Sequence, residues 1–373
     1  MKSAHASARA GFTLIEILMV VLIIGLLSGI LLVAVTAGLR KAQEAAVSTE
    51  IQQLSMAIEN FKNDTGIYPL TMGMSSADDR THDNDNEIDK TPRALRTMRA
   101  FAKVFPRYSP GSYSNIILDV SAGTLYTLPA GTPVDSGRSI DSMDAAESLV
   151  FWLGGLPDPN SETKLIGFRS DPANPFKYFP GTNPPTNPID PIYLQKRKQQ
   201  PYFPFVPSRL VDRDNDGWWE YIPQGTPSSG AEMPPYVYFN GTGYNDFPAY
   251  PMGNIGEANM PVWGTAIPYA ADATAKGTNP SSNPPANLKV QWMNSQKYQI
   301  IAAGRDGSYG SRLPTTLFGN STPSRVDLLR ELRLLPSCQR ITEFNDEAER
   351  QQFLLQFDNQ TNFTTGKVGD EAQ

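Results

Sequence analysis

The sequence predicts an α+β fold in which one long N-terminal helix packs on an antiparallel β-sheet head with large loop insertions. An apolar run from residue 14 to residue 39 predicts the first part of the helix, and an apolar stripe at helical spacing predicts the second. The stripe consists of Val47, Ile51, Leu54, Ile58 and Phe61. The chain of 373 residues also holds 32 Pro and 29 Gly, which favours a loop-rich, β-containing head over a helical bundle.

Residues 14–39 are long and apolar enough for a membrane span. Twenty-six residues at about 1.5 Å each make a helix of roughly 39 Å, which exceeds the hydrocarbon thickness of a bilayer. Glu16 is the one charged residue in this run. A carboxylate inside a span costs about 2.5–3.5 kcal/mol on insertion scales, so it indicates a function by default. Lys2 and Arg9 precede the run and favour a cytoplasmic N-terminus, with the bulk of the chain across the membrane.

The stretch Gly-Phe-Thr-Leu-Ile-Glu, residues 11–16, resembles the type III signal of type IV pilins and type II secretion pseudopilins. The resemblance implies that residues 1–11 are a leader, which a prepilin peptidase removes by cutting after Gly11 before methylating the new amine of Phe12. It also implies that Glu16 pairs with the Phe12 amine of a neighbouring subunit during assembly. The expected partners are this chain itself, sister pilins or pseudopilins, and an inner-membrane assembly platform.

We expect a single helix within residues 12–66, about 75 Å long, and a head over residues 67–373. Gly66 follows Asn63-Asp64-Thr65 and precedes Pro69, which is typical of a helix C-terminus. Two helices with a break near Gly38 are the alternative. The expected polar side of the helix consists of Lys41, Glu44, Glu50, Gln52, Gln53 and Glu59. The segment from residue 50 to residue 69 is similar to the region that follows this helix in major pseudopilins.

The head is expected to contain further helices and a single antiparallel sheet. A second helix starts at Thr91-Pro92, and a third covers residues 143–153, with Asp141 or Ser142 as its N-cap and Gly154-Gly155 as its end. The strands are expected at residues 115–120, 123–128, 218–222, 236–239, 288–293 and 298–303. Residues 157–207 are a Pro-rich insertion pinned down by aromatic side chains, and residues 311–357 are a helical extension with helices at 324–335 and 346–357.

Two stretches near the C-terminus add to the resemblance. Residues 298–307, Tyr-Gln-Ile-Ile-Ala-Ala-Gly-Arg-Asp-Gly, resemble the last strand and following loop of pseudopilin-like proteins. Residues 358–363, Asp-Asn-Gln-Thr-Asn-Phe, resemble the ending that often follows that loop, although residues 311–357 separate the two stretches here. The resemblance therefore covers residues 11–69 and 298–310, and most of the middle of the chain lies outside it.

A D-x-D-x-D-G loop at residues 212–217 is the candidate metal site. Asp212, Asp214 and Asp216 bring three carboxylates toward one hard cation, and the Gly allows the sharp turn. The twelfth position is Pro223 instead of a bidentate Glu, which excludes a regular EF-hand. Glu220, the Trp218 carbonyl or an acid distant in sequence would then complete the shell of a Ca²⁺ ion. Asp306 marks a second candidate, because pseudopilins commonly bind calcium in this C-terminal loop. A plain Asp/Gly turn is the alternative at residues 212–217.

Composition narrows the function classes. The formal charge is −6, and about −8 without Lys2 and Arg9, which argues against nucleic-acid binding. One Cys rules out an intrachain disulfide, and no catalytic motif stands out, so we expect no enzyme. The sequence thus predicts a pseudopilin of a type II secretion-like system in the bacterial inner membrane, with its head in the periplasm. The alternatives are a type IV pilus subunit and a membrane-tethered, calcium-dependent glycan-binding protein that uses Trp218 and Trp219.

Overall fold

The computed structural model describes a long N-terminal helix, much of the head and a short C-terminal segment. The described residues are 14–72, 92–111, 116, 140, 143–156, 164–168, 173, 175–176, 201–213, 217–225, 233–246, 266–275, 288–309, 333–334, 359–364 and 367. The chain divides into two compact units, Met1–Ala46 and Val47–Gln373.

The long helix α1 covers Leu14–Thr65 without a break, so the alternative with two helices and a break near Gly38 is wrong. Its second part buries the predicted stripe, and Ala57 joins the stripe on the same face. The helix ends as expected from the sequence. The Gly66 amide donates to the Lys62 carbonyl at 2.7 Å, and Gly66 has φ +81°, a conformation that glycine adopts without the steric cost of a side chain.

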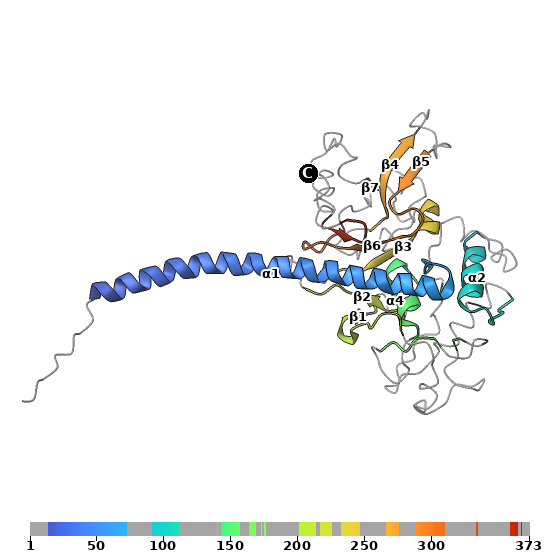
Figure 1. The fold of residues 1–373 in the computed structure, drawn as a ribbon, viewed down its shortest axis with the longest axis horizontal. Helices are drawn as coiled ribbons and strands as arrows, with labels where there is room; N and C mark the ends of the chain where they lie inside the picture. The colour runs from blue at the N-terminus through green and yellow to red at the C-terminus, as the bar shows by residue number, and fades with distance from the viewer. Residues whose placement is uncertain are drawn as a thin grey trace, which may run out of the picture. The chain divides into compact units, whose positions relative to one another are not determined.

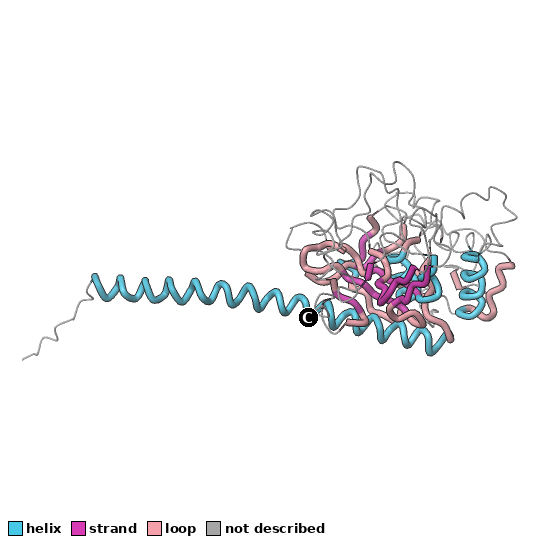
Figure 2. Tube along the Cα trace, turned by 90° about the horizontal axis from the view of Figure 1, so that it is seen from above, coloured by secondary structure: helices cyan, strands magenta, loops and turns pink. Residues whose placement is uncertain are grey.

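Two shorter helices can be placed among the described residues of the head. Helix α2 covers Pro92–Val104, as the sequence predicts, and lies near the Thr65 end of α1 in both views (Figures 1 and 2). Helix α4 covers Ala145–Gly154 and is buried over its whole length. Its N-cap is Asp144, so the prediction of Asp141 or Ser142 is wrong. The carboxylate of Asp144 accepts from the amides of Ala146 and Glu147, while Glu147 accepts in return from the Asp144 amide.

The strands within the described residues form three small sheets, so the prediction of a single sheet is wrong. Strands β1 (Leu210–Val211) and β2 (Glu220–Tyr221) pair with each other, and the second sheet has the order β3-β6-β8, with bounds Val237–Asn240, Tyr298–Ala302 and Gln360–Thr361. The third has the order β5-β4-β7, with bounds Leu288–Trp292, Tyr269–Ala275 and Arg333–Leu334. All pairs are antiparallel except β4 with β7. Short 3₁₀ helices at Pro207–Arg209 (η3) and Gly241–Asp246 (η4) flank the strands.

Aromatic side chains dominate the core between α1, α2 and α4. The ring centroids of Phe61 and Trp152 lie 5.7 Å apart, and those of Phe101 and Trp152 lie 5.2 Å apart, both edge to face. The Trp152 indole also donates to the Leu70 carbonyl at 2.8 Å, which ties α4 to the segment after α1. Phe176 and Phe203 of the Pro-rich insertion are buried in this core. The expectation that aromatics pin the insertion down is confirmed for these two residues.

Several expectations fall on residues outside the described ones. These are the leader at 1–11, the strand at 123–128, the helix at 346–357 and all of the strand at 115–120 except Ile116. Ile116 is helical, so the predicted strand is wrong at that residue. Of the expected helix at 324–335, only residues 333–334 are described, and they form strand β7. The predicted end of that helix is therefore wrong.

Candidate functional site

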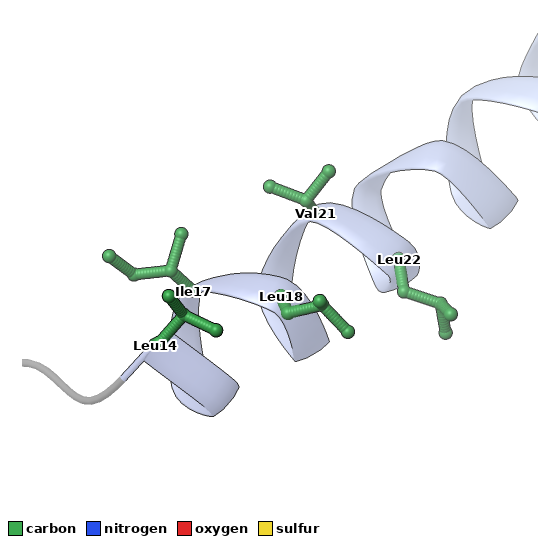
Figure 3. Close-up of a pocket in the computed structure, with 5 residues that line it drawn as sticks. All are labelled: Leu14, Ile17, Leu18, Val21 and Leu22. Carbon is green, nitrogen blue, oxygen red and sulfur yellow. The ribbon is translucent and has the colours of Figure 1, made fainter.

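The first turns of α1 present apolar side chains to solvent. Figure 3 shows Leu14, Ile17, Leu18, Val21 and Leu22, which line an open apolar groove on one side of the helix. Glu16 is exposed in the same turns and, at 100° per residue, faces the opposite side from this groove. Residues 17–39 carry no further charge. The segment therefore offers apolar surface all round, with one carboxylate near its start.

Within the described part of the chain, α1 is the one helix that is long and apolar enough to cross a membrane, judged by length and composition. Glu16 lies in the first helical turn, where a negative charge interacts favourably with the positive end of the helix dipole. Gly11 and Phe12 precede the described residues, so the predicted cleavage site stays a prediction.

Glu50 connects the second part of α1 to the head through a largely buried ion pair. The two terminal nitrogens of Arg209, in η3, donate to the two carboxylate oxygens of Glu50 at 2.7 and 2.5 Å. The side chains of Arg209 and Glu50 are 15% and 13% exposed. Arg209 also donates to the Ile222 carbonyl from two of its nitrogens, at 2.8 and 2.6 Å. This bidentate pair therefore connects α1 to η3 and to the segment that follows β2.

Two tyrosine hydroxyls complete the surroundings of Glu50. Tyr221 of β2 donates to one carboxylate oxygen at 3.0 Å, and Tyr236, just before β3, donates to the other at 2.6 Å. The Arg209 guanidinium lies over the Tyr221 ring, 4.3 Å from its centroid. Burial and then the nearby Glu50 carboxylate raise the pKa of both tyrosines, so both hydroxyls stay protonated and donate at neutral pH.

The sequence predicts Glu50 on the polar side of the helix, whereas in the structure its side chain is largely buried and paired with Arg209. Position 50 lies next to Ile51 and one helical turn after Val47, so it borders the buried stripe. This place at the border of the stripe is the one feature of the sequence that could have indicated the burial of Glu50. It was not sufficient, because Arg209, Tyr221 and Tyr236 lie more than 150 residues away along the chain.

The two C-terminal stretches that resemble pseudopilins are neighbours in space. Strand β6 pairs with β8 in register Ile301↔Thr361 and Ala302↔Gln360, across the separating residues 311–357. The Asn359 side chain accepts from the Gly304 amide at 3.2 Å and donates to the Tyr309 carbonyl at 3.0 Å. Asn359 is fully buried, so it ties the loop after β6 to the C-terminal segment.

The described half of the D-x-D-x-D-G loop has the geometry of a tight Asp/Gly turn. The Gly217 amide donates to the Asp212 carboxylate at 2.9 Å, and Gly217 has φ +90°. The Glu220 carboxylate, 6% exposed, forms an ion pair with Arg213 at 2.7 Å, and Arg213 also donates to the Met233 carbonyl. Asp212 therefore accepts a hydrogen bond from within the loop, and Glu220 neutralises a guanidinium.

The other predicted metal ligands are only partly described. Asp214 and Asp216 lie outside the described residues. Asp306 accepts from the Ser308 amide at 2.8 Å, as in a turn of the loop after β6. Among the residues that the structure describes, no three His, Cys, Asp or Glu side chains gather as a metal-binding group. The calcium sites stay predictions.

Trp218 and Trp219 do not form an exposed aromatic platform. Trp218 is 2% exposed, and its ring meets Phe151 edge to face at 5.5 Å between centroids. Trp219 is half-buried against the same core. A glycan needs an exposed ring face to stack on, so the glycan-binding alternative loses Trp218, one of the two side chains it named.

Comparisons with known proteins agree with the N-terminal signal. A family model described as the prokaryotic N-terminal methylation motif matches residues 6–32. A stretch of 63 residues is 33% identical to the type II secretion system core protein G of Vibrio cholerae serotype O1, covering 17% of this chain and 43% of that protein. The match therefore spans less than half of that relative's length. No solved structure matches the chain significantly.

The motif match explains the combination of a charged residue and an apolar helix at the N-terminus. The helix and the motif together fit a chain anchored in a membrane by a single span. Together, the methylation motif, the similarity to a secretion core protein and the α+β arrangement behind a long apolar helix support a pilin-like chain related to the pseudopilins.

Proposed function

We propose that this chain is a structural subunit, a pseudopilin, of a type II secretion-like pseudopilus. A prepilin peptidase cleaves after Gly11 and methylates the Phe12 amine, and the mature chain assembles through its N-terminal helix. Before assembly it resides in the bacterial inner membrane with its head in the periplasm. Its role is structural, and its partners are further copies, sister pseudopilins and the inner-membrane assembly platform.

One observation carries this proposal: α1 is a single helix with two different surfaces. Its first part exposes apolar side chains such as Leu18 and Val21, with Glu16 as the one charge up to residue 39, while its second part buries Leu54 and Ile58 at 0% exposure in the head. Such a helix moves its apolar first part from lipid into the core of a fibre while the head keeps its fold. Glu16 then meets the Phe12 amine of a neighbour, which sets the register of the subunits.

A type IV pilus subunit remains the second candidate. The resemblance applies to both machines, but fibre pilins often close their C-terminal region with a disulfide, which a chain with one Cys does not form within itself. The similarity to a secretion core protein also favours the pseudopilus. Imaging of the cell surface separates the two candidates, because long fibres extending from wild-type cells indicate a pilus.

We also propose that a calcium ion binds the loop at residues 212–217. Asp212, Asp214 and Asp216 would hold it, together with backbone oxygens, and the Asp212–Gly217 hydrogen bond supports the turn that this requires. When bound, the ion would stabilise the loop before β2. Glu220 is not part of this shell, because its carboxylate forms an ion pair with Arg213.

Replacing Glu16 tests the assembly proposal. Glu16→Leu removes the charge that meets the neighbour's amine, so we expect normal membrane levels and normal cleavage but no sheared or cross-linkable filament. Glu16→Asp keeps the charge with a shorter reach and is expected to assemble partially. Ser28→Leu is the matched control, because it removes a polar group from the same span without touching the charge. Assembly of Glu16→Leu at wild-type levels would overturn the proposal.

The cleavage step has its own test. Gly11→Val places a branched side chain at the scissile position, and the full-length chain should persist when the matching peptidase is present. Mass spectrometry of the purified chain measures this. Normal maturation of Gly11→Val would show that the leader is assigned wrongly.

A further inference from the structure

Two adjacent basic residues, Arg40 and Lys41, follow directly after the apolar part of α1, and we call them the basic pair. Both side chains are exposed, that of Lys41 by 86%. Over the described residues 14–46, the charged side chains are Glu16, the basic pair and Glu44. The apolar segment therefore has a carboxylate near its first end and two cations directly after its second end.

The distance between these charged ends matches the thickness of a bilayer. Arg40 lies 24 residues after Glu16, which corresponds to about 36 Å along a helix. The hydrocarbon of a bilayer is about 30 Å thick, and the bilayer is about 40–45 Å thick with its headgroup layers. When the helix stands along the bilayer normal, each charged end lies about 3 Å outside the hydrocarbon. The basic pair is then at the level of the lipid phosphates.

The contacts of the basic pair within the chain leave it accessible to an anion. The Lys41 ammonium lies 3.7 Å from a carboxylate oxygen of Glu44. An exposed ion pair of this kind contributes little stability, so a phosphate can replace the carboxylate as the partner of Lys41. A Cβ added at Gly38 would meet no atom within 4 Å, so the surface just before the pair is also accessible. A guanidinium binds phosphate through two parallel hydrogen bonds, and an ammonium binds it as a point charge.

The position of the basic pair works against the orientation that we propose for the span. Lysines and arginines close to a span favour the cytoplasmic side of the membrane. Lys2 and Arg9 precede the span, and the equal number of basic residues directly after it opposes the transfer of the head across the membrane. An anionic partner at the headgroup level would offset this cost.

We propose that Arg40 and Lys41 bind the phosphate of an anionic phospholipid at the end of the span. The inference rests on the membrane-anchored subunit of the proposed function and names its lipid partner. The bound lipid holds the helix at a fixed depth before assembly, and the helix releases the lipid when it moves into a fibre. Each basic residue at an anionic surface favours binding about fivefold, so the pair should favour anionic over zwitterionic lipid about 30-fold.

Native mass spectrometry of the full chain released from lipid nanodiscs tests this preference. The nanodiscs contain equal amounts of phosphatidylglycerol, which is anionic, and phosphatidylcholine, which is zwitterionic. We expect the wild-type chain to retain phosphatidylglycerol, and Arg40→Gln with Lys41→Gln to reduce the preference about 30-fold. Equal retention of both lipids by the wild-type chain, or an unchanged preference in this double variant, overturns the proposal.

The matched control removes the same charge elsewhere. Arg99→Gln with Lys103→Gln changes two exposed positions of α2 and should keep the wild-type preference. The same loss in both double variants would show that only the net charge of the chain matters, which overturns the proposal.

Two further variants separate the effect of charge from that of a damaged helix. Arg40→Lys with Lys41→Arg keeps both cations and should retain most of the preference. Arg40→Glu with Lys41→Glu should make phosphatidylcholine the preferred lipid, because like charges then face each other. A charge-reversed chain that still selects phosphatidylglycerol, or a charge-preserving chain that loses the preference, overturns the proposal.

The state of the fibres separates this inference from the proposed function. Fibres of a wild-type chain that retains both lipids equally overturn lipid binding and leave the function standing. A preference for phosphatidylglycerol without fibres supports lipid binding and overturns the function. A wild-type chain that does not insert into the nanodiscs overturns both.

Discussion

Glu50 is charged, yet the head surrounds its carboxylate with donors from three separate segments. Arg209 alone supplies two of them, at 2.7 and 2.5 Å. Burying an ion pair costs desolvation, so the pair adds little net stability over an apolar contact of the same shape. Breaking it is costly, however, because the remaining charge stays buried. The pair therefore mainly determines which position of α1 contacts η3 and β2. It adds little to the free energy of folding.

Arg209→Met is expected to reduce the free energy of unfolding of the head by about 3–5 kcal/mol, because it leaves the Glu50 carboxylate buried without its cation. Denaturant unfolding of the full chain in detergent, followed by tryptophan fluorescence, measures this. Lys41→Met is the matched control in the same helix: the Lys41–Glu44 pair is 3.7 Å long with Lys41 86% exposed, and its loss should cost about 0–1 kcal/mol. Equal effects of the two substitutions would refute the buried-pair argument.

The calcium proposal also depends on single carboxylates. Added calcium should raise the unfolding free energy of the wild-type chain by about 2.7 kcal/mol at a hundredfold excess over Kd, because the ion binds only the folded loop. Asp214→Ala should abolish that gain without a comparable loss in chelator. Thermal unfolding in calcium and in chelator measures both. A wild-type melting temperature that does not change when calcium is added would contradict the proposed site.

At the scale of elements, the end of helix α4 depends on a close backbone approach. Gly155 has φ +77°, and a Cβ at this position would lie 2.2 Å from the Cα of Gly167. The Gly167 amide donates to the Gly154 carbonyl at 2.8 Å, so the two segments cannot separate without losing a hydrogen bond. A side chain at residue 155 would therefore meet both strain and a steric clash.

Gly155→Ala is expected to be the most destabilising of three glycine substitutions, at about 2–5 kcal/mol, because strain and overpacking add. Gly66→Ala should cost about 1 kcal/mol, since φ is +81° there but no atom lies within 4 Å of the new Cβ. Gly243→Ala meets neither problem and should stay within about 0.5 kcal/mol of wild type. Denaturant midpoints of the three variants give the order, and a Gly155→Ala variant as stable as Gly243→Ala would contradict the close approach.

At the scale of the whole molecule, the head is held by an aromatic core and by tyrosines whose hydroxyls are buried. Burial raises the pKa of Tyr298 to about 12, and it also raises the pKa of Tyr202, Tyr221, Tyr236, Tyr238 and Tyr244. The hydroxyl of Tyr238 donates to the Pro69 carbonyl at 2.7 Å and that of Tyr298 to the Ser55 carbonyl at 3.3 Å. Both bonds require the protonated form.

The head is therefore expected to lose stability at alkaline pH. An unfolded tyrosine releases its proton near pH 10, while the folded Tyr298 retains it up to about 12. The unfolded state then binds fewer protons, so the contribution of Tyr298 to the free energy of unfolding is constant below about pH 10 and falls as pH rises above it. Unfolding free energies across this range measure the slope. Tyr298→Phe should make the slope shallower, and a flat profile up to pH 12 would contradict the buried hydroxyls.

Elements that depend on local information could be predicted from the sequence. The unbroken helix α1, its buried stripe, its end at Gly66 and strands β3 and β6 follow from periodicity and from glycine placement, which act over a few residues. The N-terminal signal is likewise a short motif. The N-cap at Asp144 was missed although it is local, because Asp141 and Ser142 are equally good capping residues.

Contacts between segments that are distant in sequence could not be predicted and are visible only in the folded chain. The burial of Glu50 depends on Arg209, and the pairing of β6 with β8 crosses residues 311–357, so no local pattern encodes either. The division of the strands into three sheets and the burial of Trp218 have the same origin. The spacing of side chains predicts which of them share one face of an element. Their partners on other elements depend on packing across the whole chain, where both shape and charge must fit.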